Sequence, residues 1–484
     1  MKNRFIPRLI GLLVCTVLLQ CFGGCTMHRE PEKAGLVIYM PGSSTVSQDG
    51  LALINERLDQ YVYEKLGVHA QLELPDNYSQ AAKLALTGGR QVDIAYCVTL
   101  SDMRDLQKSG LLLPMDDLLE EHGQGILNTM DSMFYDFARQ DGAVYALPTN
   151  REKHQIVGFE YNRALAEQYG LDLSAVHRAE DLTQVFAELK QKAPDITPTA
   201  VVPQFIRFNN TDNLEDGYAV LNGEANTRVV NLYETQEFQS FANLLYQWNS
   251  KGYLVDFKNQ AGTILYYLRS GTVFGAITVG KVGFEAQESN LSGMDIGFQP
   301  LGETYCPTDA QERAWYVIPA TSADPEKAME LLTLLYTDPE IANLILYGVE
   351  GTHYTYVDRE NQVIRLNASK GAPAYSGPMG YAYCNQYIAA IPEGYDPDIW
   401  EQTEQVNMTA VRSPAWGFRF DSTPVADQVF RCDQVRDRYL GTIYAGLCDP
   451  AEILPEFLTE LQKAGIDAVI AEKQRQLDLY LQGE

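Results

Sequence analysis

Short polar side chains follow three segments that are predicted strands, at the points where those strands end. The polar segments are 43–45 after the apolar run 36–40, 99–102 after the run 92–96, and 149–154 after the turn and short strand at 141–148. In parallel α/β sheets, ligands bind at the loops that follow the carboxyl ends of the strands. We therefore expect these side chains to hydrogen-bond the hydroxyl groups of a small ligand. The Ser43-Ser44-Thr45 run could equally cap a helix.

The sequence lacks the motifs of the common catalytic and metal sites. It contains no GxSxG nucleophile elbow, no HExxH zinc motif and no Walker loop. Acidic pairs such as Asp116-Asp117 abut on a predicted helix surface, whereas glycoside hydrolysis needs two carboxylates that flank the substrate. The polar stretch 209–223 does not match the ligand spacing of a calcium loop, so we interpret it as a surface loop. We expect no enzyme activity, no metal and no other cofactor.

The elements that position the polar segments alternate between strands and helices. Residues 36–40 form a continuous apolar run, which is typical of a buried parallel strand. Residues 51–62 then place apolar side chains at helical spacings. This alternation continues along most of the chain, so the sequence predicts an α/β fold with a mainly parallel sheet covered on both faces. From residue 421 the pattern is mostly helical. A chain of 484 residues exceeds what one core usually organises, and we expect at least two lobes.

The first 25 residues have the pattern of an export signal that ends at a cysteine. Lys2, Arg4 and Arg8 precede an apolar core at 9–19, and small residues stand directly before Cys25. An apolar core of about 11 residues is too short for a stable membrane span, which needs roughly 20. We predict cleavage before Cys25 and acylation of this cysteine, which would anchor the protein at the outer face of a membrane. Ordinary cleavage with free secretion is the alternative.

Charge and cysteine content narrow the choice of partner and compartment. The chain has 37 basic and 64 acidic residues, and its net charge of -27 disfavours binding to nucleic acid. The cysteines that remain after the signal are odd in number and include no CxxC pair: Cys97, Cys306, Cys384, Cys432 and Cys448. They argue against a zinc site and a disulfide framework. We expect buried free thiols, with a single bridge from Cys432 to Cys448 as the alternative.

Several motifs resemble one protein family. Residues 142–148 (GAVYALP) resemble the lobe-crossing strand of bacterial extracellular solute-binding proteins, and residues 324–332 resemble the helix after a later crossing. The more specific motifs are 347–354 (YGVEGTHY), 417–421 (GFRFD), 464–467 (AGID) and 472–478 (EKQRQLD). They are similar to family 1 solute-binding lipoproteins that carry their own C-terminal helical domain of unknown function. The resemblance covers residues 36–481, and Trp416 departs from it because an aliphatic residue is usual there.

The resemblance implies a two-lobe, periplasmic-binding-protein-like fold of type 2, with a hinge and a ligand enclosed between the lobes. It implies a monomeric, membrane-anchored receptor that delivers a small solute, with a carbohydrate or oligosaccharide as first choice, to the permease subunits of an ABC transporter. One alternative is a peptide or an amino-acid derivative as the ligand. Another is a surface glycan-binding lipoprotein or enzyme without a permease.

We predict the following division of the chain, with crossings between the lobes near residues 149, 280 and 316. It is a signal peptide at 1–24, a tether at 25–35, lobe 1 at 36–149 and 285–315, lobe 2 at 150–284 and 316–415, and a C-terminal helical region at 416–484.

Candidate ligand-binding residues can be chosen from the chemical groups that a sugar ring presents. A pyranose has an apolar face, on which aromatic rings stack, and a rim of hydroxyl groups that need hydrogen-bonding partners. Tyr96 and Asp102 lie near positions where sugar-binding relatives place an aromatic ring and a carboxylate. The predicted stacking residues are Tyr96, Tyr383 and Trp416, and the predicted hydroxyl partners are Ser44, Asp102 and Asn150.

Overall fold

The computed structural model describes residues 35–42, 46–140, 142–201, 207–208, 211–223, 225–255, 264–367 and 373–483. Two predicted site residues, Cys25 and Ser44, lie outside the described residues, as does the whole predicted signal peptide. The acylation of Cys25 and the binding role of Ser44 therefore stay predictions.

Lobe 1 is built on a five-stranded sheet in the order β2-β1-β3-β15-β6. Its central part is parallel, since β1 (Leu36–Tyr39) pairs in the same direction with β2 (Ala70–Glu73) and β3 (Ile94–Thr99). The remaining strands, β15 (Arg313–Val317) and β6 (Leu147–Pro148), add in antiparallel fashion. Every residue of β1 is buried, as its apolar run predicts.

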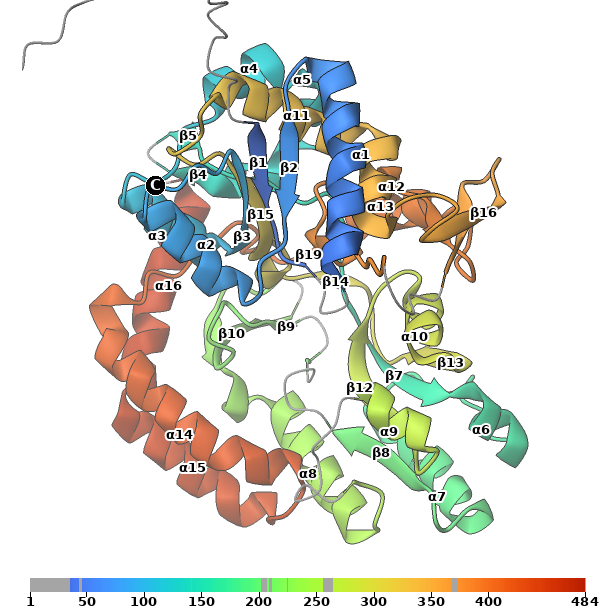
Figure 1. Cartoon of the computed structure of the whole chain (residues 1–484). Coiled ribbons are helices and arrows are strands. Elements are labelled where there is room, and N and C mark those ends of the chain that lie inside the picture. Colours follow the sequence, from blue (N-terminus) through green and yellow to red (C-terminus); the bar gives the residue numbers. More distant parts are fainter. Residues whose placement is uncertain are drawn as a thin grey trace, which may run out of the picture. The chain divides into compact units, whose positions relative to one another are not determined.

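Helices cover the lobe 1 sheet and supply the rest of its core (Figure 1). In α1 (Gln48–Leu66) the buried residues Ile54, Leu58 and Val62 recur every four positions, so one stripe of the helix faces the core. The other helices of this lobe are α2 (Tyr78–Thr87), α3 (Leu100–Lys108), α4 (Asp116–His122), α5 (Gln124–Leu127), α11 (Pro325–Thr337) and α12 (Pro339–Tyr347). Two small sheets complete it: β4 (Arg139–Gln140) with β5 (Ala143–Val144), and β16 (Tyr354–Asp358) with β17 (Val363–Leu366) and β18 (Ile391–Pro392).

Lobe 2 has a separate four-stranded sheet and a separate core. The sheet order is β13 (Ile296–Pro300), β7 (Ile156–Asn162), β12 (Val273–Gly280) and β8 (Thr197–Val201), and only the β12–β8 pair is parallel. Its helices are α6 (Arg163–Tyr169), α7 (Leu182–Lys192), α8 (Gln236–Ser250), α9 (Ile264–Ser270) and α10 (Phe284–Ser292). A small sheet adds β9 (Thr211–Asp212), β10 (Ala219–Asn222) and β11 (Val229–Asn231).

The predicted division of the chain after residue 284 is wrong. The segment 285–300 belongs to lobe 2, because β13 pairs with β7 and α10 packs on β13. The segment from β15 to Ala389 belongs to lobe 1, because β15 lies between β3 and β6 and the following helices fill the lobe 1 core. The apolar run 314–319 indicated a strand, but its spacing could not show which sheet the strand joins.

A two-stranded sheet and a helix lie near the crossings between the lobes. The short strand β14 (Tyr305–Cys306) pairs in parallel with β19 (Val411–Arg412), and α13 (Ile399–Thr409) precedes β19. The chain therefore passes between the lobes at residues 149–155, again between β13 and β15, and a third time in the region of α13 and β19.

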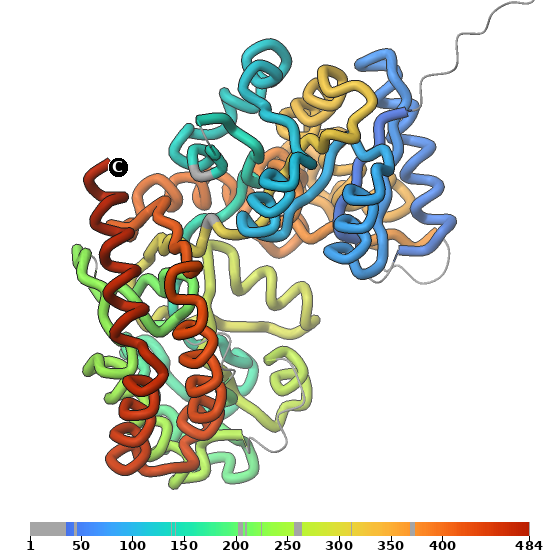
Figure 2. The backbone as a smooth tube through the Cα atoms, turned by 90° about the vertical axis from the view of Figure 1, so that its left-hand side faces the viewer, coloured from blue at the N-terminus to red at the C-terminus, as the bar shows by residue number. Residues whose placement is uncertain are grey.

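Three helices form the C-terminal region: α14 (Ala426–Tyr444), α15 (Pro450–Ala464) and α16 (Ile466–Gln482). Figure 2 shows them in red, packed against one another. Their apolar side chains, including Val435, Phe457 and Leu477, belong to the core of lobe 2. Helices α14 and α15 contact α8, and α16 contacts β11, so this region extends lobe 2.

The side chain of Lys473 fixes α16 to the loop between β9 and β10. Its ammonium group is fully buried and donates to the carbonyl oxygens of Leu214 (2.7 Å) and Ala219 (3.0 Å) and to the Asp216 carboxylate (2.6 Å). Burial lowers the pKa of Lys473, and the charge of Asp216 opposes this shift. The polar stretch before β10 thus binds the ammonium group of Lys473, a residue of the same chain.

The described residues include no helix that is both long and apolar enough to cross a membrane. They also include no cluster of three or more His, Cys, Asp or Glu side chains that could hold a metal ion. The five described cysteines are free, and four of them are buried. The expectation of free thiols is confirmed, and the alternative bridge from Cys432 to Cys448 is wrong.

Replacing Lys473 with Met should destabilise the protein by about 3–5 kcal/mol, because a buried carboxylate and two buried carbonyl groups lose their cation. Chemical denaturation followed by tryptophan fluorescence measures the loss. The control is Lys463→Met, which removes an exposed lysine that pairs with Glu460 on α15. Equal stability of the two variants would contradict the anchoring role of Lys473.

Candidate functional site

Glu152, in the first crossing between the lobes, bonds to both lobes. Its carboxylate accepts from the ammonium of Lys281, at the end of β12 (2.9 Å), and from the side-chain amide of Gln386 in lobe 1 (3.0 Å). Burial alone would raise the pKa of Glu152, but the charges of Lys281 and Arg151 lower it to about 2. The carboxylate is therefore ionised at neutral pH and links the two lobes.

Neighbouring residues of this crossing are held by Asn407 of α13. The Asn407 amide oxygen accepts from the backbone N–H of Lys153 (2.7 Å) and lies 3.0 Å from Nδ1 of His154. The backbone N–H of Val282 donates to Nε2 of His154 (3.3 Å), so Nδ1 carries the proton of a neutral ring. Burial lowers the pKa of His154, which favours this neutral form. The crossing thus has fixed hydrogen bonds to lobe 2 and to α13.

A pocket of about 430 Å³ lies beside Glu152 and is lined by both lobes. We call it the interlobe pocket. Lobe 2 contributes the segment 281–291, with α10, and lobe 1 contributes the end of α12, the end of β17 and residues 378–386. The remaining wall is the segment 392–403, which includes the start of α13.

The walls of the interlobe pocket carry apolar side chains that the fold leaves uncovered. Leu291, Leu366, Met379 and Tyr381 are each between 41% and 56% exposed, although they come from separate parts of the chain. Trp400 also lines the pocket, and its indole N–H donates to the carbonyl of Ala389 (2.8 Å), which fixes the ring. Exposed apolar groups that gather in one concave place are typical of a ligand site.

Polar groups alternate with these apolar walls. The amides of Gln287 and Asn290 face the pocket from α10, and the Arg365 guanidinium pairs with Glu393 at its edge through two hydrogen bonds of 2.6 and 2.7 Å. Together with Glu152 and Lys281, they offer both donors and acceptors. The arrangement suits a ligand that has apolar faces and many hydroxyl groups.

Two predicted site residues, Tyr96 and Asp102, line one narrow crevice of about 100 Å³ at the end of β3. The Tyr96 ring is almost fully buried and packs edge-on against Tyr316, with ring centroids 5.6 Å apart. Burial and the neighbouring phenol of Tyr381 raise its pKa. The Asp102 carboxylate accepts from the backbone N–H (3.2 Å) and the hydroxyl (2.8 Å) of Thr99, and so completes the cap of α3.

The other predicted residues lie apart from this crevice. Asn150 is buried in the first crossing, where its side chain donates to the Thr129 carbonyl (3.1 Å). Tyr383 is fully buried in the lobe 1 core, so in this conformation its ring has no surface on which a ligand could stack. The turn at 380–382 points Tyr381 outward and Tyr383 inward, which the tyrosine-rich sequence could not reveal.

Trp416 lines a different pocket, between lobe 1 and α16. Its ring packs edge-on against Phe134 with centroids 6.3 Å apart, and its carbonyl accepts from the hydroxyl of Tyr480 (2.5 Å). Arg104 of α3 and Gln476 of α16 line the same pocket. The structure therefore places Trp416 where the C-terminal region meets lobe 1, and not with the walls of the interlobe pocket.

Sequence reasoning missed Trp400 and Lys281, which both line the interlobe pocket. Trp400 is one of only four tryptophans and follows a loop rich in Gly, Pro and Asp, which is the signal that could have selected it. Lys281 follows a buried strand, so the rule that selected residues after strand ends applies to it as well.

Comparison with known proteins identifies the family. Residues 46–342, well over half of the chain, match the family described as bacterial extracellular solute-binding protein. The chain belongs to this family. Residues 414–482 match a domain of unknown function, DUF3502, which corresponds to the C-terminal helical region. The predicted family is confirmed, and the protein is an extracellular solute-binding protein and not an enzyme.

This solute-binding protein has relatives in Streptococcus pneumoniae. A curated carbohydrate ABC transporter substrate-binding protein of strain TIGR4 is 26% identical over 449 residues, which cover 90% of this chain and 89% of the relative. The crystal structure of the N-glycan transport solute binding protein NgtS is 25% identical, covers 93% of this chain and 99% of NgtS, and has a TM-score of 0.83. NgtS in complex with Man5GlcNAc gives a TM-score of 0.70 at 24% identity, with the same coverage. The predicted two-lobe fold is confirmed.

The stability of lobe 2 should depend on pH through Glu160, a buried residue of β7. Its Oε1 atom has no hydrogen-bond partner within the described residues, and burial, aided by Glu288 of α10, raises its pKa to about 8. Because the folded state binds this proton more tightly than the unfolded state does, stability falls as the pH rises from about 4.5 to about 8.

Glu160→Gln removes this titration. The stability of the variant relative to the native protein should therefore increase with pH between 5 and 8, by up to about 1.4 kcal/mol for each pH unit. Urea denaturation at several pH values measures the trend, and Glu167→Gln on the exposed face of α6 controls for the loss of a surface charge. A difference that does not change with pH would show that Glu160 is already ionised when the protein is folded.

Proposed function

We propose that this protein captures an oligosaccharide outside the cell and delivers it to the permease subunits of an ABC transporter. The observation that carries the proposal is the interlobe pocket, where uncovered aromatic and aliphatic side chains alternate with amides, a carboxylate and a lysine. A hydroxylated ring needs this combination, since it has an apolar face and a polar rim. Two relatives support the ligand class, because their names include carbohydrate and N-glycan transport.

Specific residues of the pocket have distinct roles in this proposal. Tyr381 and Trp400 provide rings for stacking, while Gln287 and Asn290 bond hydroxyl groups from lobe 2. Glu152 holds the lobes together and accepts hydrogen bonds from ligand hydroxyl groups. The crevice with Tyr96 and Asp102 lies near this wall, since Tyr381 of the wall is close enough to Tyr96 to help raise the pKa of Tyr96.

Closure of the lobes accompanies binding in this proposal. The chain matches one NgtS crystal structure at a TM-score of 0.83 and the NgtS complex with Man5GlcNAc at 0.70. This difference supports an arrangement of the lobes closer to the former structure. A ligand that contacts both walls favours the state in which the walls are closer together, since it gains contacts only there.

Trp400→Ala should weaken oligosaccharide binding by about 1–3 kcal/mol, the usual effect of removing an aromatic anchor. A thermal-shift screen with oligosaccharides and peptides first identifies the ligand, because bound ligand stabilises the folded protein. Titration calorimetry then compares the variant with native protein. Trp416→Ala is the matched control, since Trp416 contacts α16 and not the interlobe pocket, and it should bind with native affinity.

Each contrary result has a clear meaning. If Trp416→Ala weakens binding and Trp400→Ala does not, the ligand lies at the site predicted from the sequence. If only peptides raise the melting temperature, the ligand class proposed here is wrong and the peptide alternative is correct.

The membrane anchor is part of the proposal and depends on Cys25. With Cys25→Ser, the protein should lose its acyl chains and leave the membrane fraction, because one cysteine thiol is the acceptor for the lipid. Mass spectrometry of the N-terminal peptide, after membrane fractionation, measures the modification. A lipid-modified N-terminus in the variant would contradict the assignment of Cys25.

A further inference from the structure

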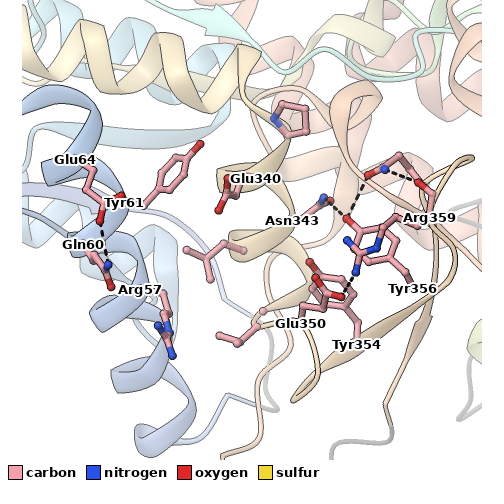
Figure 3. Close-up of a pocket in the computed structure, with 15 residues that line it drawn as sticks. Arg57, Gln60, Tyr61, Glu64, Glu340, Asn343, Glu350, Tyr354, Tyr356 and Arg359 are labelled. Carbon is pink, nitrogen blue, oxygen red and sulfur yellow. Dashed lines mark hydrogen bonds and ion pairs between the residues drawn. The ribbon is translucent and has the colours of Figure 1, made fainter.

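A second pocket, of about 620 Å³, lies on lobe 1 and has no wall from lobe 2. Figure 3 shows its two sides. Arg57, Gln60, Tyr61 and Glu64 of α1 form one side, and α12 with the β16–β17 hairpin forms the other. We call it the lobe 1 pocket. Because its walls come from one lobe, its shape does not depend on the movement of the lobes.

The tyrosines of the lobe 1 pocket are held in place by bonds to neighbouring side chains. The Tyr61 hydroxyl donates to the carboxylate of Asp338 (2.7 Å), at the N-terminal cap of α12. On the opposite side, the Tyr356 hydroxyl accepts from the amide of Asn343 (3.4 Å) and donates to Gln362 (3.2 Å). These bonds fix rings on both sides of the pocket before any ligand arrives, which lowers the entropic cost of binding.

Charges around the lobe 1 pocket nearly cancel. Arg359 pairs with Glu350 and covers the face of the Tyr356 ring at 4.2 Å. The other charged side chains of the pocket are Arg57 and Glu64 on the α1 side and Glu340 on the α12 side (Figure 3). A pocket that carries hydrogen-bond donors and acceptors, and charges of both signs, suits a neutral ligand whose groups both donate and accept hydrogen bonds. A sugar hydroxyl group does both. An anionic ligand is disfavoured by the net charge of -27.

The lobe 1 pocket shares a wall with the interlobe pocket. Leu346 and Tyr347, at the end of α12, line the interlobe pocket, whereas Leu344, Gly348 and Val349 line the lobe 1 pocket. A row of three tyrosine rings connects the two pockets. The ring centroids of Tyr347 and Tyr354 are 6.3 Å apart, and those of Tyr354 and Tyr356 are 5.7 Å apart. A ligand held at one pocket is therefore close to the other.

We propose that the lobe 1 pocket is a second saccharide-binding site, which binds sugar residues independently of the closure of the lobes. Tyr61 and Tyr356 provide the rings, and Arg57 and Glu340 bond the hydroxyl groups. The choice of ligand class rests on the proposed function of the interlobe pocket, whereas the existence of the second site rests on the geometry of lobe 1 alone.

Titration calorimetry with Man5GlcNAc, and with the best oligosaccharide of the thermal-shift screen, tests this proposal in four proteins. Native protein should show two binding events. The double variant Arg57→Ala, Glu340→Gln should lose the weaker event or weaken it about tenfold, since it lacks bonds to charged groups. Both residues are exposed, so the fold is retained, and Glu56→Ala on the neighbouring position of α1 is the matched control. Trp400→Ala should affect only the stronger event.

The outcomes separate the two proposals. A single event in native protein that Trp400→Ala weakens and the double variant leaves unchanged overturns the second site and keeps the interlobe site. An event that only the double variant weakens, with none sensitive to Trp400→Ala, keeps the second site and overturns the interlobe site. No event with any oligosaccharide overturns both. If the double variant binds sugars as native protein does but stimulates its permease less, the pocket is a protein contact and the second site is overturned.

Discussion

The arrangement of the site depends on the bonds that the ionised carboxylate of Glu152 makes. It lies in the first crossing and bonds at once to Lys281 of lobe 2 and Gln386 of lobe 1. A buried charge is stable only when it is paired, so the segments that carry its partners must stay together. Those same segments line the interlobe pocket, whose walls lie on two otherwise separate cores. The structure thus joins the lobes at one side of the pocket, and this is the geometry of a hinge.

The C-terminal region has a structural role that follows from its contacts. Its three helices complete the core of lobe 2, and Lys473 supplies a buried cation to the loop between β9 and β10. Arg419, just before these helices, pairs with Glu215 of the same loop. Trp416 and Tyr480 bring the end of this region against lobe 1. A domain without an assigned function therefore acts here as a support for lobe 2 that also contacts lobe 1.

Much of the fold could be predicted from the sequence because it depends on local patterns. The buried run of β1 and the four-residue spacing in α1 stand in the structure as their patterns predict. The predicted lobe boundary after residue 315 falls inside β15, because long-range pairing, and not a local pattern, decides which sheet a strand joins. The expectation of mainly parallel sheets was also too simple, since β15, β6, β7 and β13 all make antiparallel pairs.

The site was harder to predict than the fold, because burial decides which aromatic rings can meet a ligand. Tyr381 and Tyr383 are two positions apart in the same loop, yet one is exposed at the interlobe pocket and the other is fully buried. Trp416 follows a proline in an irregular segment, but the structure places it at the pocket shared with α16 and not at the interlobe pocket. Trp400 and Lys281 reach the pocket only because α13 and α10 pack beside the first crossing, and no local pattern shows that packing.

Small-angle X-ray scattering with and without saturating oligosaccharide tests whether ligand binding brings the lobes together. The account predicts a smaller radius of gyration with ligand, because the closed state gains contacts from both walls of the interlobe pocket. The radius of gyration of the Trp400→Ala variant should decrease less at the same ligand concentration. An unchanged radius, at a concentration where calorimetry shows full occupancy, would contradict the account.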